Sequence, residues 1–174
     1  IGGTAAGAGN LISGNGTPGV QGGGIYIKSS NNTVQGNKIG TKVDGTSALA
    51  NAFRGVAILP TGSAANNNLI GGTVAGAGNI IAFNGGIGVE LGGAPDPIGN
   101  RIQGNSIFGN GALGIDLGGN GITANDTGDG DTGPNNLQNF PALSSVTTSG
   151  GATNITGTLN STPSTTFRIE FFAN

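Results

Sequence analysis

The feature that most constrains this chain is a short unit, Gly-Asn-x-Ile, four copies of which align with one another as a repeat. Its asparagines are Asn10, Asn37, Asn79 and Asn105, and each is followed two residues later by isoleucine. The last copy lies in the stretch 100–117, NRIQGNSIFGNGALGIDL, where short apolar segments alternate with Gly-Asn pairs. Because Gly and Asn supply turn conformations, the chain must bend every few residues. A glycine every few positions also excludes long amphipathic helices.

Two further sets of equivalent positions repeat together with the Gly-Asn-x-Ile unit, and we call each such set a column. One aligns four segments of the form Gly-apolar-x-apolar, which are 24–27, 55–58, 88–91 and 114–117, and the other aligns Ile1, Val34, Ile70 and Ile102. The last two copies are regular, since Asn79 and Asn105 lie 26 residues apart. Earlier copies carry extra residues, above all 41–54, which we expect to bulge as a loop. Insertions of uneven length between constant short strands are typical of a solenoid.

This pattern predicts an all-β fold: a right-handed parallel β-helix of about four rungs over residues 1–122. A leucine-rich repeat would need a leucine consensus that the chain lacks. Equivalent residues on neighbouring rungs would lie about 4.8 Å apart, which stacks the isoleucines inward. Asn10, Asn37, Asn79 and Asn105 would then form a structural ladder in which each amide bonds to the next rung. Asn15, Asn84 and Asn110 suggest a second ladder.

Composition excludes several classes of function. The chain has no Cys and no His, which removes a thiolate nucleophile, the commonest general base and the commonest zinc ligand. Its net charge of −2 argues against a nucleic-acid partner, because phosphate binding needs clustered Lys and Arg. No apolar run is long enough to predict membrane insertion.

The rungs resemble the right-handed parallel β-helix repeats of large bacterial secreted or cell-surface proteins. Residues 114–143, GIDLGGNGITANDTGDGDTGPNNLQNFPAL, are similar to the stretch that closes the helix in that family. Residues 155–174 resemble the opening strands of a following β-sandwich. The resemblance implies an extracellular or cell-surface location and an adhesive or structural role. It supplies no catalytic motif, so no catalytic residue is transferred.

Glu90 and Asp116 are the carboxylates with the clearest chemical potential. They occupy the same outward position on adjacent rungs, which places their carboxyl groups about 5 Å apart, the separation used by retaining glycosidases. One interpretation is therefore a polysaccharide-degrading lyase or glycosidase, for which a groove lined by Tyr26, Lys28 and Arg101 would be expected. The other interpretations are an exposed pair that tolerates weak repulsion in water, or a pair bridged by a cation.

A second acidic cluster, Asp126, Asp129 and Asp131, lies in the Gly-rich segment 125–133. Asp and backbone oxygens are ligands that suit Ca²⁺, although the spacing is not that of an EF-hand. The cluster is either a structural calcium site or an acidic, solvated linker.

The C-terminal part is expected to close the stack and begin a second unit. Residues 123–143 form an Asp/Gly-rich junction and cap, with Phe140 and Leu143 covering the last rung. Residues 144–174 predict antiparallel strands over 153–159 and 165–172, joined around 160–163, as an incomplete β-sandwich or as strands that pair with a neighbour.

The favoured function is a non-enzymatic extracellular structural or adhesion module, a rigid rod that assembles end to end into a filament. The alternative is the polysaccharide-degrading enzyme that uses Glu90 and Asp116. Candidate partners are a second copy of the chain and carbohydrate. Because the chain begins inside a repeat, we expect it to be a fragment of a longer protein.

Overall fold

The computed structural model describes residues 1–17 and 22–172, and these residues form an all-β structure built mainly of stacked parallel strands. The first sheet has the order β1-β4-β7-β10, the second β2-β5-β8-β11 and the third β3-β6-β9. The strands of the first sheet are β1 (Leu11–Ile12), β4 (Lys38–Ile39), β7 (Ile80–Ala82) and β10 (Ser106–Phe108). Those of the second are β2 (Ile25–Ile27), β5 (Val56–Ile58), β8 (Val89–Leu91) and β11 (Ile115–Leu117), and those of the third are β3 (Thr33–Val34), β6 (Leu69–Gly71) and β9 (Arg101–Gln103).

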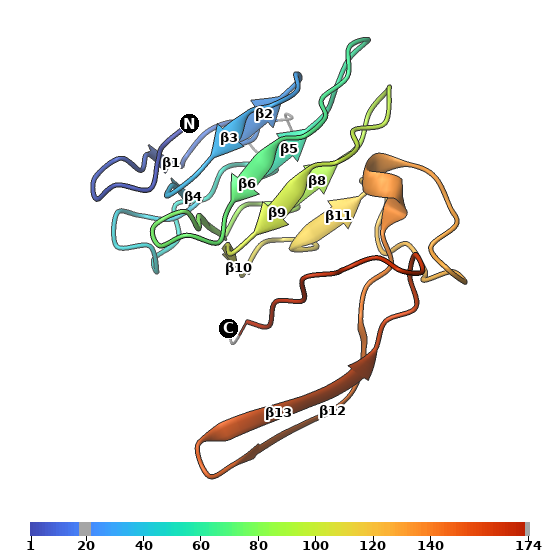
Figure 1. Cartoon of the computed structure of the whole chain (residues 1–174). Coiled ribbons are helices and arrows are strands. Elements are labelled where there is room, and N and C mark those ends of the chain that lie inside the picture. Colours follow the sequence, from blue (N-terminus) through green and yellow to red (C-terminus); the bar gives the residue numbers. More distant parts are fainter. Residues whose placement is uncertain (18–21, 173–174) are drawn as a thin grey trace.

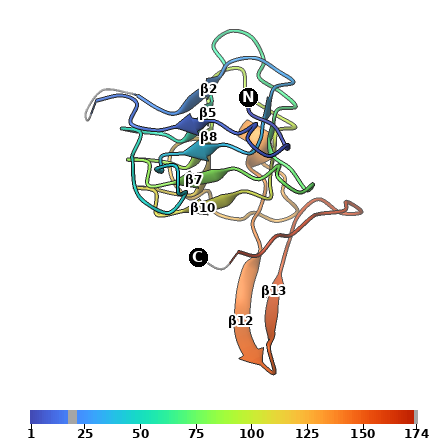
Figure 2. The ribbon, with the colours of Figure 1, turned by 90° about the vertical axis from the view of Figure 1, so that its left-hand side faces the viewer.

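The chain visits the three sheets in the same order on each circuit, so every circuit adds one strand to each sheet (Figures 1 and 2). All pairings inside these sheets are parallel. The arrangement is compatible with the β-helix that the repeats predict. Within the described residues, no helix has the length and apolarity that a membrane crossing requires.

The strand columns predicted from the repeats are confirmed, except that Ile1 lies in no described strand and adjoins the third column only through the bridge between Gly2 and Gln35. In the first sheet, Ile12 pairs with Ile39, Ile39 with Ile81, and Ile81 with Ile107. The second sheet aligns Ile25, Val56, Val89 and Ile115, and the third aligns Val34, Ile70 and Ile102.

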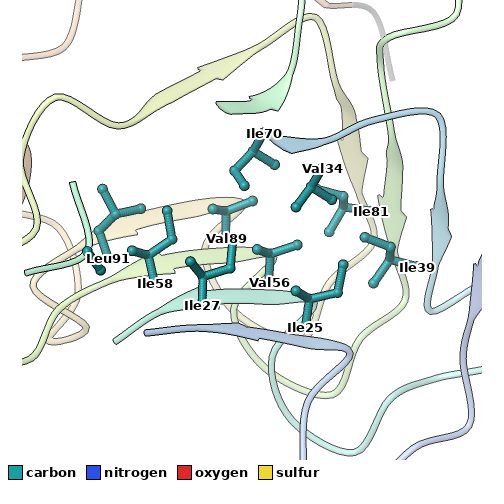
Figure 3. Packing of buried hydrophobic residues seen from close by; sticks show 11 residues of the cluster. Ile25, Ile27, Val34, Ile39, Val56, Ile58, Ile70, Ile81, Val89 and Leu91 are labelled. Atoms are coloured by element: carbon teal, nitrogen blue, oxygen red, sulfur yellow. The ribbon is translucent and has the colours of Figure 1, made fainter. Parts of the chain in front are cut away.

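These columns point their aliphatic side chains into one shared core (Figure 3). In the middle rungs the core is fully closed, since Ile39, Ile58, Ile70, Ile81 and Leu91 have no exposed surface. At the two ends it opens, and Ile12, Ile102, Ile107 and Leu117 are only partly buried. Burial of aliphatic surface against the neighbouring rung is therefore the main stabilising contribution to the stack.

Close packing between rungs explains the glycine that precedes each strand of the second sheet. A Cβ atom placed on Gly55 would lie 2.6 Å from Cγ2 of Ile81 and 2.7 Å from the carbonyl oxygen of Gly88. A residue with a side chain would therefore force the rung apart.

The insertion 41–54 is only partly the loop that we expected. Its first half makes a small turn, in which Thr41 bridges Ala48 and the Asp44 carboxylate accepts hydrogen bonds from the amides of Thr46 and Ser47, both at 2.8 Å. Its second half returns to the body of the stack, where Asn51 is fully buried.

The C-terminal region differs from the prediction. A short turn, η1 (Pro134–Leu137), is followed by an antiparallel hairpin of β12 (Ala142–Ser149) and β13 (Ala152–Thr158), which projects from the stack (Figures 1 and 2). The hairpin turns at Gly150-Gly151, both with positive φ, and not at 160–163. The strand expected over 165–172 is absent from the described sheets, and the segment expected over 153–159 pairs as β13 with β12 instead. The last two residues of the predicted segment 144–174 lie outside the described residues.

Candidate functional site

The four asparagines of the repeated unit are joined by hydrogen bonds from rung to rung. Oδ1 of Asn79 accepts bonds from both the backbone N–H and the side-chain amide of Asn37, each at 2.9 Å. Asn79 in turn donates the same two bonds to Oδ1 of Asn105, and Asn10 donates them to Asn37. Asn37, Asn79 and Asn105 are all at least 97% buried. The ladder thus satisfies polar groups at the corner before the first sheet.

Two more ladders run parallel to the first. The second contains Asn15, Asn51, Asn84 and Asn110, and it includes Asn51, which the sequence interpretation had placed in a loop. The third contains Asn32, Asn68, Asn100 and Asn135, none of which had been singled out. A signal for the third was present, because its first three members each stand two residues before an apolar residue of the third column.

All three ladders run in one direction. In the bonds between asparagines, each Asn inside a ladder donates to the Asn of the rung that follows in the sequence and accepts from the Asn of the rung before it. Side-chain amides also donate back to backbone carbonyls of the preceding rung, as Asn79 does to Val34. Among the described residues, Oδ1 of Asn10, Asn15 and Asn32 therefore accepts no hydrogen bond at the first rung. At the last rung, the backbone N–H groups of Asn105 and Asn110 donate to no described residue, whereas Asn100 donates to Asn135.

Glu90 and Asp116 are register neighbours on β8 and β11, but the pair is not exposed. Each residue is only 4% exposed. The Glu90 carboxylate forms an ion pair with Nε of Arg54, whose side chain is 12% exposed. Sequence reasoning missed Arg54 because it lies at the end of an insertion. Burial alone would lower the pKa of Arg54, but the hydrogen bond and charge of Glu90, with a smaller contribution from Tyr26, raise it.

Asp116 is held by the segment that follows its own strand. Its two carboxylate oxygens accept hydrogen bonds from the amides of Gly119 and Gly121, both at 3.1 Å. This turn also covers Glu90, because a Cβ atom on Gly119 would lie 2.6 Å from Oε1 of Glu90. Gly119 has φ +70°, so the position favours glycine on backbone grounds as well. The arrangement holds both carboxylates in fixed contacts.

A cavity of about 800 Å³ lies between the last rung and the C-terminal segment. Apolar side chains such as Ile102, Leu117 and Phe167 line it together with Arg101 and Asp116. The cavity does not include Glu90, Tyr26 or Lys28, so it does not unite the residues expected to form a sugar groove. Phe140 lines the cavity as part of the expected cap, whereas Leu143 lies in β12 and is 53% exposed.

The three aspartates of the acidic cluster lie close together. One carboxylate oxygen from each of Asp126, Asp129 and Asp131 lies within 4.8 Å of the others. The loop is fastened to the base of the hairpin by Asn139, which is 3% exposed. Its Oδ1 accepts from the Asp126 amide at 3.0 Å, and its Nδ2 donates to the carbonyls of Asp126 at 2.8 Å and Asn160 at 2.7 Å.

The C-terminal segment reaches the open end of the stack through Glu170. Its carboxylate accepts a hydrogen bond of 2.7 Å from the Gly104 amide, whereas the equivalent amide of Gly72 donates to the next rung at the Gln103 carbonyl. Glu170 therefore takes the place of a next-rung carbonyl. The hydrogen bond from the Gly104 amide lowers the pKa of Glu170. Burial opposes this shift, and the ion pair with Arg168 adds to it.

We expect this contact to weaken in acid. The pKa of Glu170 is lower in the folded chain than in the unfolded chain, where it is about 4.3. The contribution of Glu170 to the free energy of unfolding is therefore complete above the unfolded pKa and is lost as the pH falls through the folded pKa. In Glu170→Gln, the Gly104 amide should exchange with solvent about tenfold faster at neutral pH, since a charge-assisted bond is replaced by a neutral one. Amide exchange by NMR checks this, with Gly72 as the internal reference. Equal exchange at Gly104 in both proteins would contradict it.

A comparison of the chain with protein-family models, with curated proteins and with solved structures found no match. The chain is therefore described by its own architecture: an all-β chain with three sheets of stacked parallel strands and an antiparallel hairpin.

Proposed function

We propose that the chain is a right-handed parallel β-helix that serves as a non-enzymatic structural or adhesion module at the cell surface or outside the cell. The observation that carries this proposal is the set of three asparagine ladders running through consecutive rungs around a closed aliphatic core. Each rung is fixed to the next by both backbone and side-chain bonds. Such a stack suits a stiff spacer or display surface better than a site that must change shape around a substrate.

End-to-end assembly follows from the direction of the ladders. The first rung offers side-chain acceptors on Asn10, Asn15 and Asn32, and the last rung offers backbone donors on Asn105 and Asn110. If the last rung of one copy met the first rung of the next, two of the ladders would continue in their own direction across the joint. The segment 166–172 and the turn that contains Asn135 would both have to leave the last rung for this joint to close, because Glu170 contacts Gly104 and Asn135 contacts Asn100.

Electron microscopy and sedimentation velocity over a range of concentrations test the assembly. Rods whose length increases with protein concentration are expected, and Glu170→Ala should lengthen them because it removes the Gly104 contact that covers part of the last rung. A chain that stays monomeric at every concentration, with and without this substitution, would rule out end-to-end assembly.

An activity screen on pectin-like and alginate-like polymers tests the enzymatic alternative, with Glu90→Gln as the matched variant. We expect no turnover by either protein, because the Glu90 carboxylate is buried against Arg54. Turnover by the wild-type chain that Glu90→Gln abolishes would replace the structural proposal with the enzymatic one.

A further inference from the structure

The rungs of the stack alternate between two kinds of corner before the first sheet. The first and third rungs have a long corner, residues 2–9 and 71–78, within the nearly identical stretches IGGTAAGAGN and IGGTVAGAGN. The second and fourth rungs have a short corner of Gln-Gly, residues 35–36 and 103–104, within VQGN and IQGN. The structural repeat is therefore a pair of rungs, and the last rung is of the short kind.

The contact from a long corner to the short corner of the following rung occurs twice and is the same both times. The Gly3 amide donates to the Gln35 carbonyl at 2.9 Å, and the Gly72 amide donates to the Gln103 carbonyl at 2.8 Å. The second pair of rungs therefore repeats the hydrogen bonding of the first pair as well as its sequence.

The opposite contact, from a short corner to the long corner of the following rung, joins the second rung to the third. The Gly36 amide donates to the Ala77 carbonyl at 3.1 Å, and the side-chain amide of Gln35 donates to the Gly71 carbonyl at 3.0 Å. On the last rung, Gly104 occupies the position of Gly36. The joint between the second and third rungs is therefore the template for a long-corner rung that continues the stack.

We propose that a second copy of the chain docks its first rung on the last rung in this same register, and that Glu170 competes with it. The first rung has the long corner that the template requires, so the Ala8 carbonyl of the second copy corresponds to the Ala77 carbonyl. It would accept the bond from the Gly104 amide that Glu170 accepts at 2.7 Å in the single chain. This register rests on the end-to-end assembly proposed above, and it specifies which atoms meet at the joint.

The long corners provide a second contact by which the register can be tested. The two long corners lie against each other, because a Cβ atom on Gly76 would overlap the carbonyl oxygen of Thr4. In the proposed joint, Gly7 of the second copy takes the place of Gly76, and Thr73 takes the place of Thr4. In the single chain, a Cβ atom on Gly7 would meet nothing within 4 Å. A side chain at position 7 therefore fits the single chain and is excluded from the joint.

Gly7→Asn is the variant that tests the register. Gly7 has φ +80°, and Asn is one of the few residues besides glycine that adopts this conformation readily. Gly62→Asn is the matched control, because Gly62 also has φ +80° and a Cβ atom there would meet nothing within 4 Å. Gly62 lies between β5 and β6 on an inner rung, away from the joint. Both substitutions are made in the Glu170→Ala chain, in which the Gly104 amide has lost its internal acceptor.

Sedimentation velocity over a range of concentrations measures the association constant of each chain. Glu170→Ala should associate about tenfold more tightly than the wild-type chain, because a competing charge-assisted hydrogen bond is removed. Adding Gly7→Asn should weaken association at least about tenfold, as overpacking against a backbone carbonyl implies, and adding Gly62→Asn should leave it unchanged.

Hydrogen exchange of the Gly104 amide, followed by mass spectrometry, needs no substitution in the first rung and decides the question if Gly7→Asn does not fold. In Glu170→Ala, this amide should exchange at least about tenfold more slowly at concentrations where the chains associate than in dilute solution. Exchange at the same rate in associated and dilute chains would overturn the proposed register.

The outcomes separate the register from the assembly itself. If Gly7→Asn associates as tightly as Gly62→Asn, the register is wrong and end-to-end assembly still stands. If no chain associates, Glu170→Ala included, both the register and the assembly are overturned.

Discussion

Replacing Asn79 by alanine is expected to lower the free energy of unfolding by about 4 kcal/mol, because several buried groups lose their partners together. Oδ1 of Asn79 accepts from the backbone N–H and the amide of Asn37, and its Nδ2 donates to the Val34 carbonyl and to Asn105. Water cannot replace these bonds easily, since Asn37 and Asn79 are each only 1% exposed. Urea unfolding followed by circular dichroism measures the change.

Asn10→Ala is the matched control for this prediction. Asn10 is exposed at the first rung, where it donates to Asn37 and accepts from no described residue. Its loss should cost less than about 1 kcal/mol, because the backbone N–H of residue 10 still donates to Oδ1 of Asn37 and the side chain that is removed is exposed. Similar losses for Asn10→Ala and Asn79→Ala would mean that the ladder contributes no more inside the stack than at its end.

Replacing Arg54 by methionine is expected to lower the free energy of unfolding by about 3 kcal/mol, because the Glu90 carboxylate would remain buried without its partner. The Glu90 side chain is 5% exposed, and its register neighbour Asp116 is also buried and acidic. Methionine keeps much of the apolar length of arginine, so the loss reports mainly on the charge. The same urea experiment measures it.

The double variant Arg54→Met/Glu90→Gln supplies the control. With no ionised carboxylate at position 90, most of the lost stability should return, which a double-mutant cycle expresses as a coupling free energy. If the double variant is no more stable than the single variant Arg54→Met, Arg54 acts through packing and not through its charge.

The stacked strands were predictable because the signal that defines them is local and repeated. Each Gly-Asn-x-Ile unit contains both the turn and the inward side chain, so aligning the units gives the register directly. The position of Glu90 beside Asp116 follows from the same alignment. Their burial does not, because it depends on Arg54 from another rung and on the turn at Gly119.

Residues inside insertions were the hardest to place. Asn51 and Arg54 follow a polar segment of variable length, and their residue types alone do not distinguish them from the loop that precedes them. The spacing to Gly55 did contain a signal: Asn51, Asn84 and Asn110 each stand four residues before the glycine that opens a strand. Asn135 carries no such signal, since it completes the third ladder from outside the repeats.

The hairpin was misplaced because alternation identifies strands but not their partners. The Gly150-Gly151 pair is a strong turn signal, and both residues have the positive φ that a tight hairpin turn requires. Giving this pair precedence over the Ser-Thr-Pro segment would have joined β12 to β13. The Phe-rich stretch 165–172 belongs to none of the described sheets.

The common direction of the three ladders also bears on the order in which the chain can fold. Asn10 meets its acceptor 27 residues later, Asn37 meets its acceptor 42 residues later and Asn79 meets its acceptor 26 residues later. In a chain that folds as it is synthesised, the ladder acceptors of one turn are therefore supplied only by the turn that follows. We expect such folding to lag behind synthesis by about one turn.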